Sequence, residues 1–189
     1  MQTSAFTRTL TPGETLCHVA SWEGQHTVLP VLQQLGTDIN ATDDAGRTPL
    51  YTACWNNQNE TVKVLYRLGA DVNKPTKYGR TPCAVAALKG HVNILCTLHK
   101  FGADLNKGSV SNTTPCCVAA RGNGTKAIET LYRLGAAINR PTKAGDTPLI
   151  VAASKGCTAS AKTLIRLKGD IEKVNKTVIC VNARISTNP

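Results

Sequence analysis

A threonine recurs every 33 residues along this chain. The five copies are Thr15, Thr48, Thr81, Thr114 and Thr147, and a proline directly follows each of the last four. A fixed period of this size indicates one supersecondary unit copied along the chain, in which each copy relies on its neighbours to bury its apolar face. The period therefore predicts a stack of repeats with a core that runs from one repeat to the next.

Other residue types hold the same register, and each has a mechanical reason to do so. The columns are Ala20, Ala53, Ala86, Ala119 and Ala152; Leu32, Leu65, Leu98, Leu131 and Leu164; Gly36, Gly69, Gly102 and Gly135; and Asn40, Asn73, Asn106 and Asn139. Thr-Pro is typical of a helix start, and alanine lets neighbouring helices approach closely. Glycine supplies the positive φ that ends a helix, and asparagine can hydrogen-bond the turning backbone. Each copy is therefore predicted to be a turn, two short helices and a turn.

With Thr-Pro-Leu at residues 48–50 and 147–149, the chain strongly resembles the ankyrin-repeat family over residues 13–173. The resemblance implies an all-α solenoid of stacked antiparallel helix pairs, with β-hairpin or turn fingers projecting to one side. The expected repeats are about 13–45, 46–78, 79–111, 112–144 and 145–173, between an N-terminal extension at 1–12 and a divergent cap or loose tail at 174–189. The family's histidine survives only as His18, and Pro30 is expected inside the second helix of the first repeat.

The eight cysteines are expected to be structural thiols. No C-x-x-C spacing occurs, and Cys17, Cys83 and Cys116 share the column of Leu50, whose side chain is expected to face the core. Neighbouring copies of a column lie about 8–10 Å apart, too far for a disulfide. The sequence therefore predicts reduced thiols, no metal site and no cofactor. Cys157 is expected to meet water in the turn between two helices.

Neither catalysis nor membrane insertion is indicated. The adjacent carboxylates Asp43 and Asp44 are expected in an exposed hairpin, and no nucleophile, base and orienting group can be nominated from spacing. No stretch approaches the roughly 18 apolar residues that a membrane span needs. We therefore expect a non-enzymatic, monomeric, intracellular protein, and specifically a cytoplasmic one.

In the ankyrin family, partners are contacted mainly by finger tips and by the exposed end of each first helix. Carried over by position, this implies a partner-binding set of Trp22, Arg47, Trp55, Lys77, Tyr78, Arg80, Leu88, Lys89, Arg121, Lys143 and Lys155. Tryptophan, tyrosine and arginine often anchor protein interfaces. The alternative for Trp22 and Trp55 is that both rings fold back over the helix ends as part of the core.

The net charge of +10 leaves a second reading of function open. Basic residues form one column near the end of the second helix and another just after the asparagine: Arg67, Lys100, Arg133 and Arg166, then Lys74, Lys107, Arg140 and Lys173. The leading hypothesis is a scaffold or adaptor that binds a protein partner, and an acidic one if this charge selects the partner rather than only keeping the array soluble. The alternative is that the basic columns bind a polyanion, such as nucleic acid or an anionic membrane surface.

Overall fold

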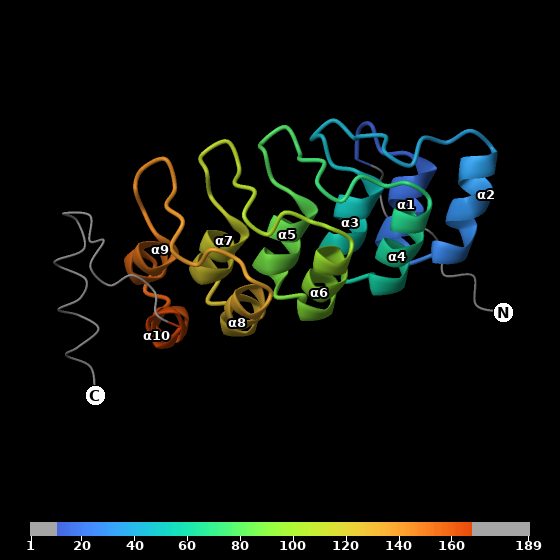
Figure 1. Ribbon diagram of the computed structural model, residues 1–189. Helices are drawn as coiled ribbons and strands as arrows, with labels where there is room; N and C mark the ends of the chain where they lie inside the picture. Colours follow the sequence, from blue (N-terminus) through green and yellow to red (C-terminus); the bar gives the residue numbers. More distant parts are fainter. Residues whose placement is uncertain (1–10, 168–189) are drawn as a thin grey trace.

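The computed structural model describes residues 11–167 and shows a row of helix pairs (Figure 1). The first helices are α1 (Leu16–Glu23), α3 (Pro49–Trp55), α5 (Pro82–Lys89), α7 (Pro115–Arg121) and α9 (Pro148–Ser154). The second helices are α2 (Leu29–Gln34), α4 (Asn59–Arg67), α6 (Val92–Lys100), α8 (Thr125–Arg133) and α10 (Thr158–Arg166), and a short 3₁₀ helix, η1 (His26–Val28), precedes α2. Within residues 11–167 there is no strand, so the predicted all-α array is confirmed.

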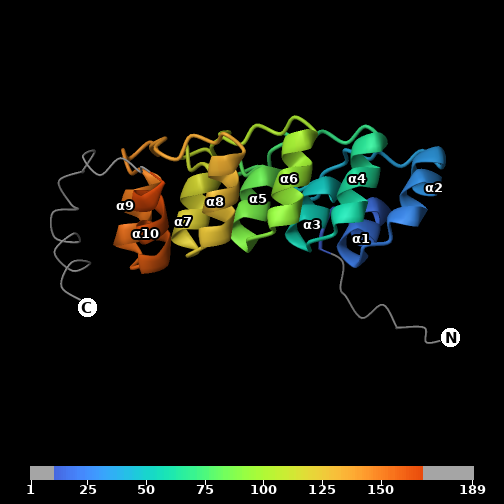
Figure 2. The same ribbon diagram turned by 60° about the horizontal axis from the view of Figure 1, so that its bottom comes forward.

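The helices form two layers. Each first helix packs on the first helix of the next pair, from α1 through α9, and α4, α6, α8 and α10 pack in the same order. Figures 1 and 2 show these two rows side by side, with the turns that connect successive pairs projecting on the side of the first helices. We call these projecting turns the fingers, and they comprise residues 42–47, 75–80, 108–113 and 141–146.

The Thr-Pro column starts the first helices as predicted. The side-chain oxygens of Thr48, Thr81, Thr114 and Thr147 each accept the backbone N–H three residues further on. Proline follows at the first helical position, where its missing N–H leaves no hydrogen bond unmade. The first repeat lacks this proline and uses a different device, centred on His18.

His18 is fully buried and links the first two repeats. Its Nε2 lies 2.8 Å from the carbonyl oxygen of Arg47, which can only accept, so Nε2 carries the proton. Its Nδ1 then accepts from the backbone N–H of Thr15 at 3.1 Å. Burial lowers the pKa of His18 below its ordinary value, because desolvation disfavours the charged ring. The neutral imidazole therefore spans from the start of α1 to the first finger.

The second helix of the first repeat is shorter than those of the later repeats. Pro30 lies inside it, as expected, and is the second residue of α2, while η1 occupies the preceding residues. Proline lacks an N–H and is tolerated only in the first turn of a helix, so the helix begins late. The predicted helix-ending glycines are confirmed, since Gly36, Gly69, Gly102 and Gly135 all have φ between +79° and +89°.

The core runs between the pairs as the leucine and alanine columns predict. Leu65, Leu98, Leu131 and Leu164 are fully buried, as are Ala53, Ala86, Ala119 and Ala152. Leu32, in the same column, is only partly buried because it belongs to the shortened α2 at the end of the row. The interior repeats therefore bury more apolar surface than the first.

The asparagine column joins one repeat to the next. The amide of Asn40 donates to the carbonyl of Gly69 at 2.9 Å and accepts the backbone N–H of Asp71 at 2.8 Å. Asn73 makes the equivalent bonds to Gly102 and Asp104. Because each amide satisfies a donor and an acceptor of the following turn, these residues fix the spacing between repeats as well as the turn.

The seven cysteines of the described residues are all free thiols. Cys17, Cys54, Cys83, Cys116 and Cys117 are buried, and burial raises their pKa values, to about 12 for Cys83 and Cys116. Cys157 is only half-buried rather than open to water, since its thiol donates to the carbonyl of Arg121 at 3.2 Å. Cys180 lies outside the described residues. No group of metal-binding side chains occurs in residues 11–167.

Alkylation should separate these thiols into two classes. We expect iodoacetamide at neutral pH to label Cys96 and Cys157 first, because both are half-buried, whereas the five buried thiols carry raised pKa values and little access. Peptide mass spectrometry against time would measure this order. Urea should make all of them react at similar rates. Early labelling of Cys83 or Cys116 in the folded protein would contradict the burial described here.

Candidate partner-binding surface

Each finger is closed by a side chain at its base. In the second to fourth fingers a hydroxyl accepts the backbone N–H four residues further on, from Arg80 to Thr76, from Thr113 to Ser109 and from Asp146 to Thr142. In the first finger Asp43 has the same role and accepts from Arg47. These local bonds give the fingers a common shape.

The fingers also bond to one another in a row. The backbone N–H of Lys77 donates to the carbonyl of Ala45 at 3.1 Å, and that of Lys143 donates to Ser111 at 2.9 Å. A Cβ added to Gly46, which has φ +77°, would lie 2.6 Å from the nitrogen of Lys77. Glycine therefore allows both the turn and the close approach of the next finger. The row is a continuous backbone ribbon beside the first helices.

The expectation that Asp43 and Asp44 are both exposed is wrong for Asp43. Its side chain is 1% exposed, whereas Asp44 is exposed. One carboxylate oxygen of Asp43 accepts the backbone N–H groups of Ala45 and Arg47, and the other accepts Nε of Arg47 at 2.5 Å. Three donors of the chain satisfy the buried carboxylate, so it closes a turn and is not an exposed acid.

Arg47 is held by the fold on three sides. Besides its bond to Asp43, its Nη2 donates to the hydroxyl of Thr11 at 3.0 Å, and its carbonyl accepts a hydrogen bond from Nε2 of His18. The sequence placed Arg47 among the partner-binding residues. These contacts give it a role in joining the first finger to the first repeat.

The two tryptophans are neither fully exposed nor fully buried in the core. Both are half-buried, so neither is the freely exposed ring that the sequence favoured. Trp55 packs against the core, and Nζ of Lys89 lies 4.0 Å from the centre of its ring. The end of α3 packs beside α5, so a large ring there meets the next helix. Trp55 therefore supports the surface position of Lys89 through a cation–π contact.

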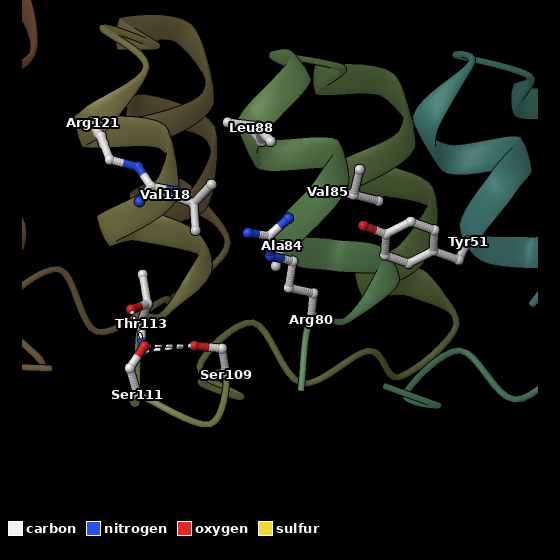
Figure 3. Close-up of a pocket in the computed structure, with 10 residues that line it drawn as sticks. All are labelled: Tyr51, Arg80, Ala84, Val85, Leu88, Ser109, Ser111, Thr113, Val118 and Arg121. Carbon is white, nitrogen blue, oxygen red and sulfur yellow. Dashed lines mark hydrogen bonds between the residues drawn. The ribbon is translucent and has the colours of Figure 1, made fainter. Parts of the chain in front are cut away.

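A hollow of about 100 Å³ lies beside α5 and α7, next to the third finger (Figure 3). Its walls are Tyr51, Arg80, Ala84, Val85, Leu88, Ser109, Ser111, Thr113, Val118 and Arg121. Three predicted binding residues, Arg80, Leu88 and Arg121, thus come together from the base of one finger and the ends of two helices. We call this space the arginine hollow.

The arginine hollow has a positive side and a hydroxyl side. Figure 3 shows the guanidinium groups of Arg80 and Arg121 pointing toward the same space, across from Ser109, Ser111 and Thr113. Burial raises the pKa of the neighbouring Tyr51 above its usual value, and the positive charge of Arg80 opposes that rise. At neutral pH the tyrosine is a neutral phenol, so the charge of the hollow is that of its arginines.

A second, wider hollow of about 340 Å³ adjoins the first. Arg121, Ser111 and Thr113 line both, and the second adds Asp146 and Lys155, among other residues. Its charge is therefore mixed. Because Arg121, Ser111 and Thr113 line both spaces, the two hollows are neighbouring parts of one surface.

The remaining predicted residues lie apart from these hollows. Lys77, Tyr78 and Lys143 are exposed on the fingers, and the side chain of Tyr78 is 68% exposed. Trp22 lies at the end of α1, where its carbonyl accepts from Gln58 of the next repeat. The structure therefore groups Arg80, Leu88, Arg121 and Lys155 closely and spreads the others along the row.

Several lining residues were missed by the sequence reasoning. Tyr51 stands in the column that begins with His18, and Val85 and Val118 share another column of the first helices. The sequence signal that could have identified Tyr51 is that tyrosine replaces histidine in this column. Ser109 was missed because the finger-closing column mixes one aspartate with hydroxyl residues, so no single residue type marks it.

The basic columns are used in part by the fold itself. Nζ of Lys74 donates to the carbonyl of Asn40 at 2.8 Å, and Lys107 makes the equivalent bond to Asn73. Arg166 forms an ion pair with Glu129 of the preceding repeat. These side chains link successive repeats. Lys173 lies outside the described residues.

Comparison with known proteins agrees with this architecture. A family model described as ankyrin repeats (3 copies) matches residues 16–109 and 98–177, which together cover most of the chain. No curated protein matches the sequence. Within residues 11–167, every helix is too short or too polar to cross a lipid bilayer. The periodic columns, the stacked helix pairs and the family match lead to one conclusion, that this chain belongs to the ankyrin-repeat family.

Proposed function

We propose that the chain is a non-catalytic interaction module, a scaffold or adaptor that binds a protein partner along its fingers and the ends of its first helices. Ankyrin repeats generally serve protein–protein interaction, which supports the general class of the proposed function but not a particular partner. The observation that carries it is the arginine hollow, where apolar, hydroxyl and cationic groups from consecutive repeats line one space. Arginine and aromatic residues such as Tyr51 are enriched in protein interfaces relative to the rest of the surface.

The proposed contact residues lie on this side of the molecule, and all of them except the half-buried Leu88 are exposed. They are Lys77, Tyr78, Arg80, Leu88, Lys89, Arg121, Lys143 and Lys155, with Trp55 supporting Lys89. Arg47 is left out because its side chain is engaged by Asp43 and Thr11. Binding to a polyanion is not proposed, since Lys74, Lys107 and Arg166 already bond to neighbouring repeats.

A paired set of variants tests this function. We expect Tyr78→Ala with Lys89→Ala to weaken binding to the partner at least tenfold, about 1.4 kcal/mol, because exposed aromatic and cationic groups often anchor interfaces. Tyr132→Ala with Arg133→Ala likewise removes one tyrosine and one basic residue, from the outer helix α8, where both side chains are exposed, and should leave binding unchanged.

The measurement is quantitative affinity capture from a cell extract, followed by titration of each captured protein against the purified variants. Thermal unfolding of both double variants would check that the array remains folded. Equal capture by wild type and the Tyr78/Lys89 variant would reject the finger side as the binding surface. Loss of capture only in the Tyr132/Arg133 variant would move the surface to the outer helices.

A further inference from the structure

We infer that the arginine hollow binds the side chain of a glutamate in an extended segment of the protein partner. This inference rests on the proposed function and names the chemistry that the surface recognises. It depends on three features of the hollow: two arginines with no acidic partner among residues 11–167, a spare hydroxyl proton, and an apolar wall of limited size.

The two arginines are the first feature. Neither Arg80 nor Arg121 has a carboxylate of residues 11–167 within ion-pair distance, and no acid lines the hollow. Elsewhere the fold does pair its arginines, since Arg47 bonds Asp43 and Arg166 bonds Glu129. The planar fork of a guanidinium matches a carboxylate and can hold it by two hydrogen bonds. The convergence of both groups in Figure 3 therefore creates a place for one carboxylate.

The hydroxyl side supplies a further donor. Ser111 lies 3.1 Å from Ser109 and 2.8 Å from Thr113, oxygen to oxygen. Three hydroxyls carry three protons, and the two bonds among them use two. The third proton has no acceptor within the chain of hydroxyls and is left for water or a ligand. An anion in the hollow would orient this chain so that the free proton points to it.

The apolar wall favours glutamate over other anionic side chains. Val85, Leu88 and Val118 line the same hollow as the two arginines and offer methyl groups, against which the two methylenes of a glutamate can lie. Aspartate and phosphoserine have one methylene each and would leave part of this wall uncovered. About 100 Å³ accommodates the end of one side chain, since a single water needs roughly 10–15 Å³ on this measure. The hollow is thus too small for a helix.

The peptide backbone would lie along the row of fingers. The fingers and the first helices form a surface that continues past the hollow in both directions, from Tyr78 to Lys155. An extended chain advances about 3.3 Å per residue, and adjacent helix pairs lie about 8–10 Å apart, so each repeat meets about three residues. One glutamate at a fixed place in the segment would then set the register of the whole contact.

A random library of twelve-residue peptides displayed on phage tests the inference directly. The full chain is immobilised under reducing conditions and compared with Arg80→Gln/Arg121→Gln. The matched control is Arg67→Gln/Arg133→Gln, which removes the same charge from exposed positions on α4 and α8. We expect wild type and control to enrich peptides with glutamate at one fixed position, and the Arg80/Arg121 variant to lose that enrichment.

Synthetic peptides from the selected set complete the test. Replacing the fixed glutamate by glutamine should weaken binding at least about tenfold, since a charge-assisted bond in a partly buried site is lost. Aspartate should bind less tightly than glutamate. Peptides without a fixed acid, or equal enrichment by the Arg80/Arg121 variant, would overturn the inference. So would tighter binding of a phosphoserine peptide, which would assign the hollow to phosphate.

Failure of this inference differs from failure of the proposed function. If no extended peptide is enriched while affinity capture still depends on Tyr78 and Lys89, the surface binds a folded partner and the glutamate inference is wrong. If capture is also insensitive to Tyr78 and Lys89, the finger side is not the binding surface. The thermal unfolding midpoint of the Arg80/Arg121 variant should match the control, because both arginines are exposed.

Discussion

Leu98→Ala is expected to lower the free energy of unfolding by about 3 kcal/mol. Leu98 is fully buried in the middle of the array, on α6, which packs between α4 and α8. Truncating a buried leucine removes its transfer free energy and leaves a cavity that the two neighbouring helices cannot close, with typical losses of about 2–5 kcal/mol. Urea denaturation followed by circular dichroism would measure the loss.

The same substitution in the first repeat is the matched control. Leu32 occupies the equivalent position but is only partly buried, because α2 is short and has a neighbouring pair on one side only among the described residues. Leu32→Ala should therefore cost about 1 kcal/mol. In a solenoid, stability is close to a sum of repeat and interface contributions, so the first repeat should also melt before the middle ones. Equal losses at the two leucines would contradict this graded stability.

The repeat periodicity predicted the parts of the fold that each unit builds for itself. Thr48 caps its helix, Leu98 is buried, and Gly69 takes a positive φ, as the columns indicate. Each of these depends on neighbours within one repeat or on the same column one repeat away. A strict sequence period allows such contacts to be predicted, since a residue type that every repeat needs recurs at the same position in each repeat.

The bonds between repeats were harder to predict. Asn40 was expected to stabilise its own turn, yet its amide bonds the turn of the next repeat. Gln58 and Cys157 both reach back to a carbonyl at the end of the preceding first helix, although they share neither size nor chemistry. A carbonyl accepts from any donor, so the position needs a donor but not a particular residue. Sequence columns sorted by residue type do not show it.

The candidate binding surface was predicted in outline and corrected in detail. Position in the family gave Arg80, Leu88 and Arg121, which the structure brings to one hollow. The tryptophans were expected to be exposed, but Trp55 packs against the core and under Lys89. Exposure at a helix end depends on the side chains of the next repeat. A single column cannot supply that information.

The last prediction concerns the buried acid of the first finger. Asp43→Ala should lower the free energy of unfolding by about 2 kcal/mol, because a carboxylate that accepts two backbone N–H groups and Nε of Arg47 is lost. A hydrogen bond to a charged group contributes about 1.5–3 kcal/mol to stability. Part of the loss is recovered here because water can reach the side chain of Arg47, which is 32% exposed. Urea denaturation measures the change.

Three further variants separate turn closure from charge. Asp44→Ala, at the exposed neighbour, should change stability by less than about 0.5 kcal/mol. Asp43→Thr introduces the residue that closes the second and fourth fingers, so it should restore the bond to the N–H of Arg47 and lose less than alanine does. Thr76→Ala breaks one neutral bond and should cost about 1 kcal/mol. If Asp43→Thr were as unstable as Asp43→Ala, the ion pair with Arg47 would be the main contribution of the aspartate, and closure of the turn a minor one.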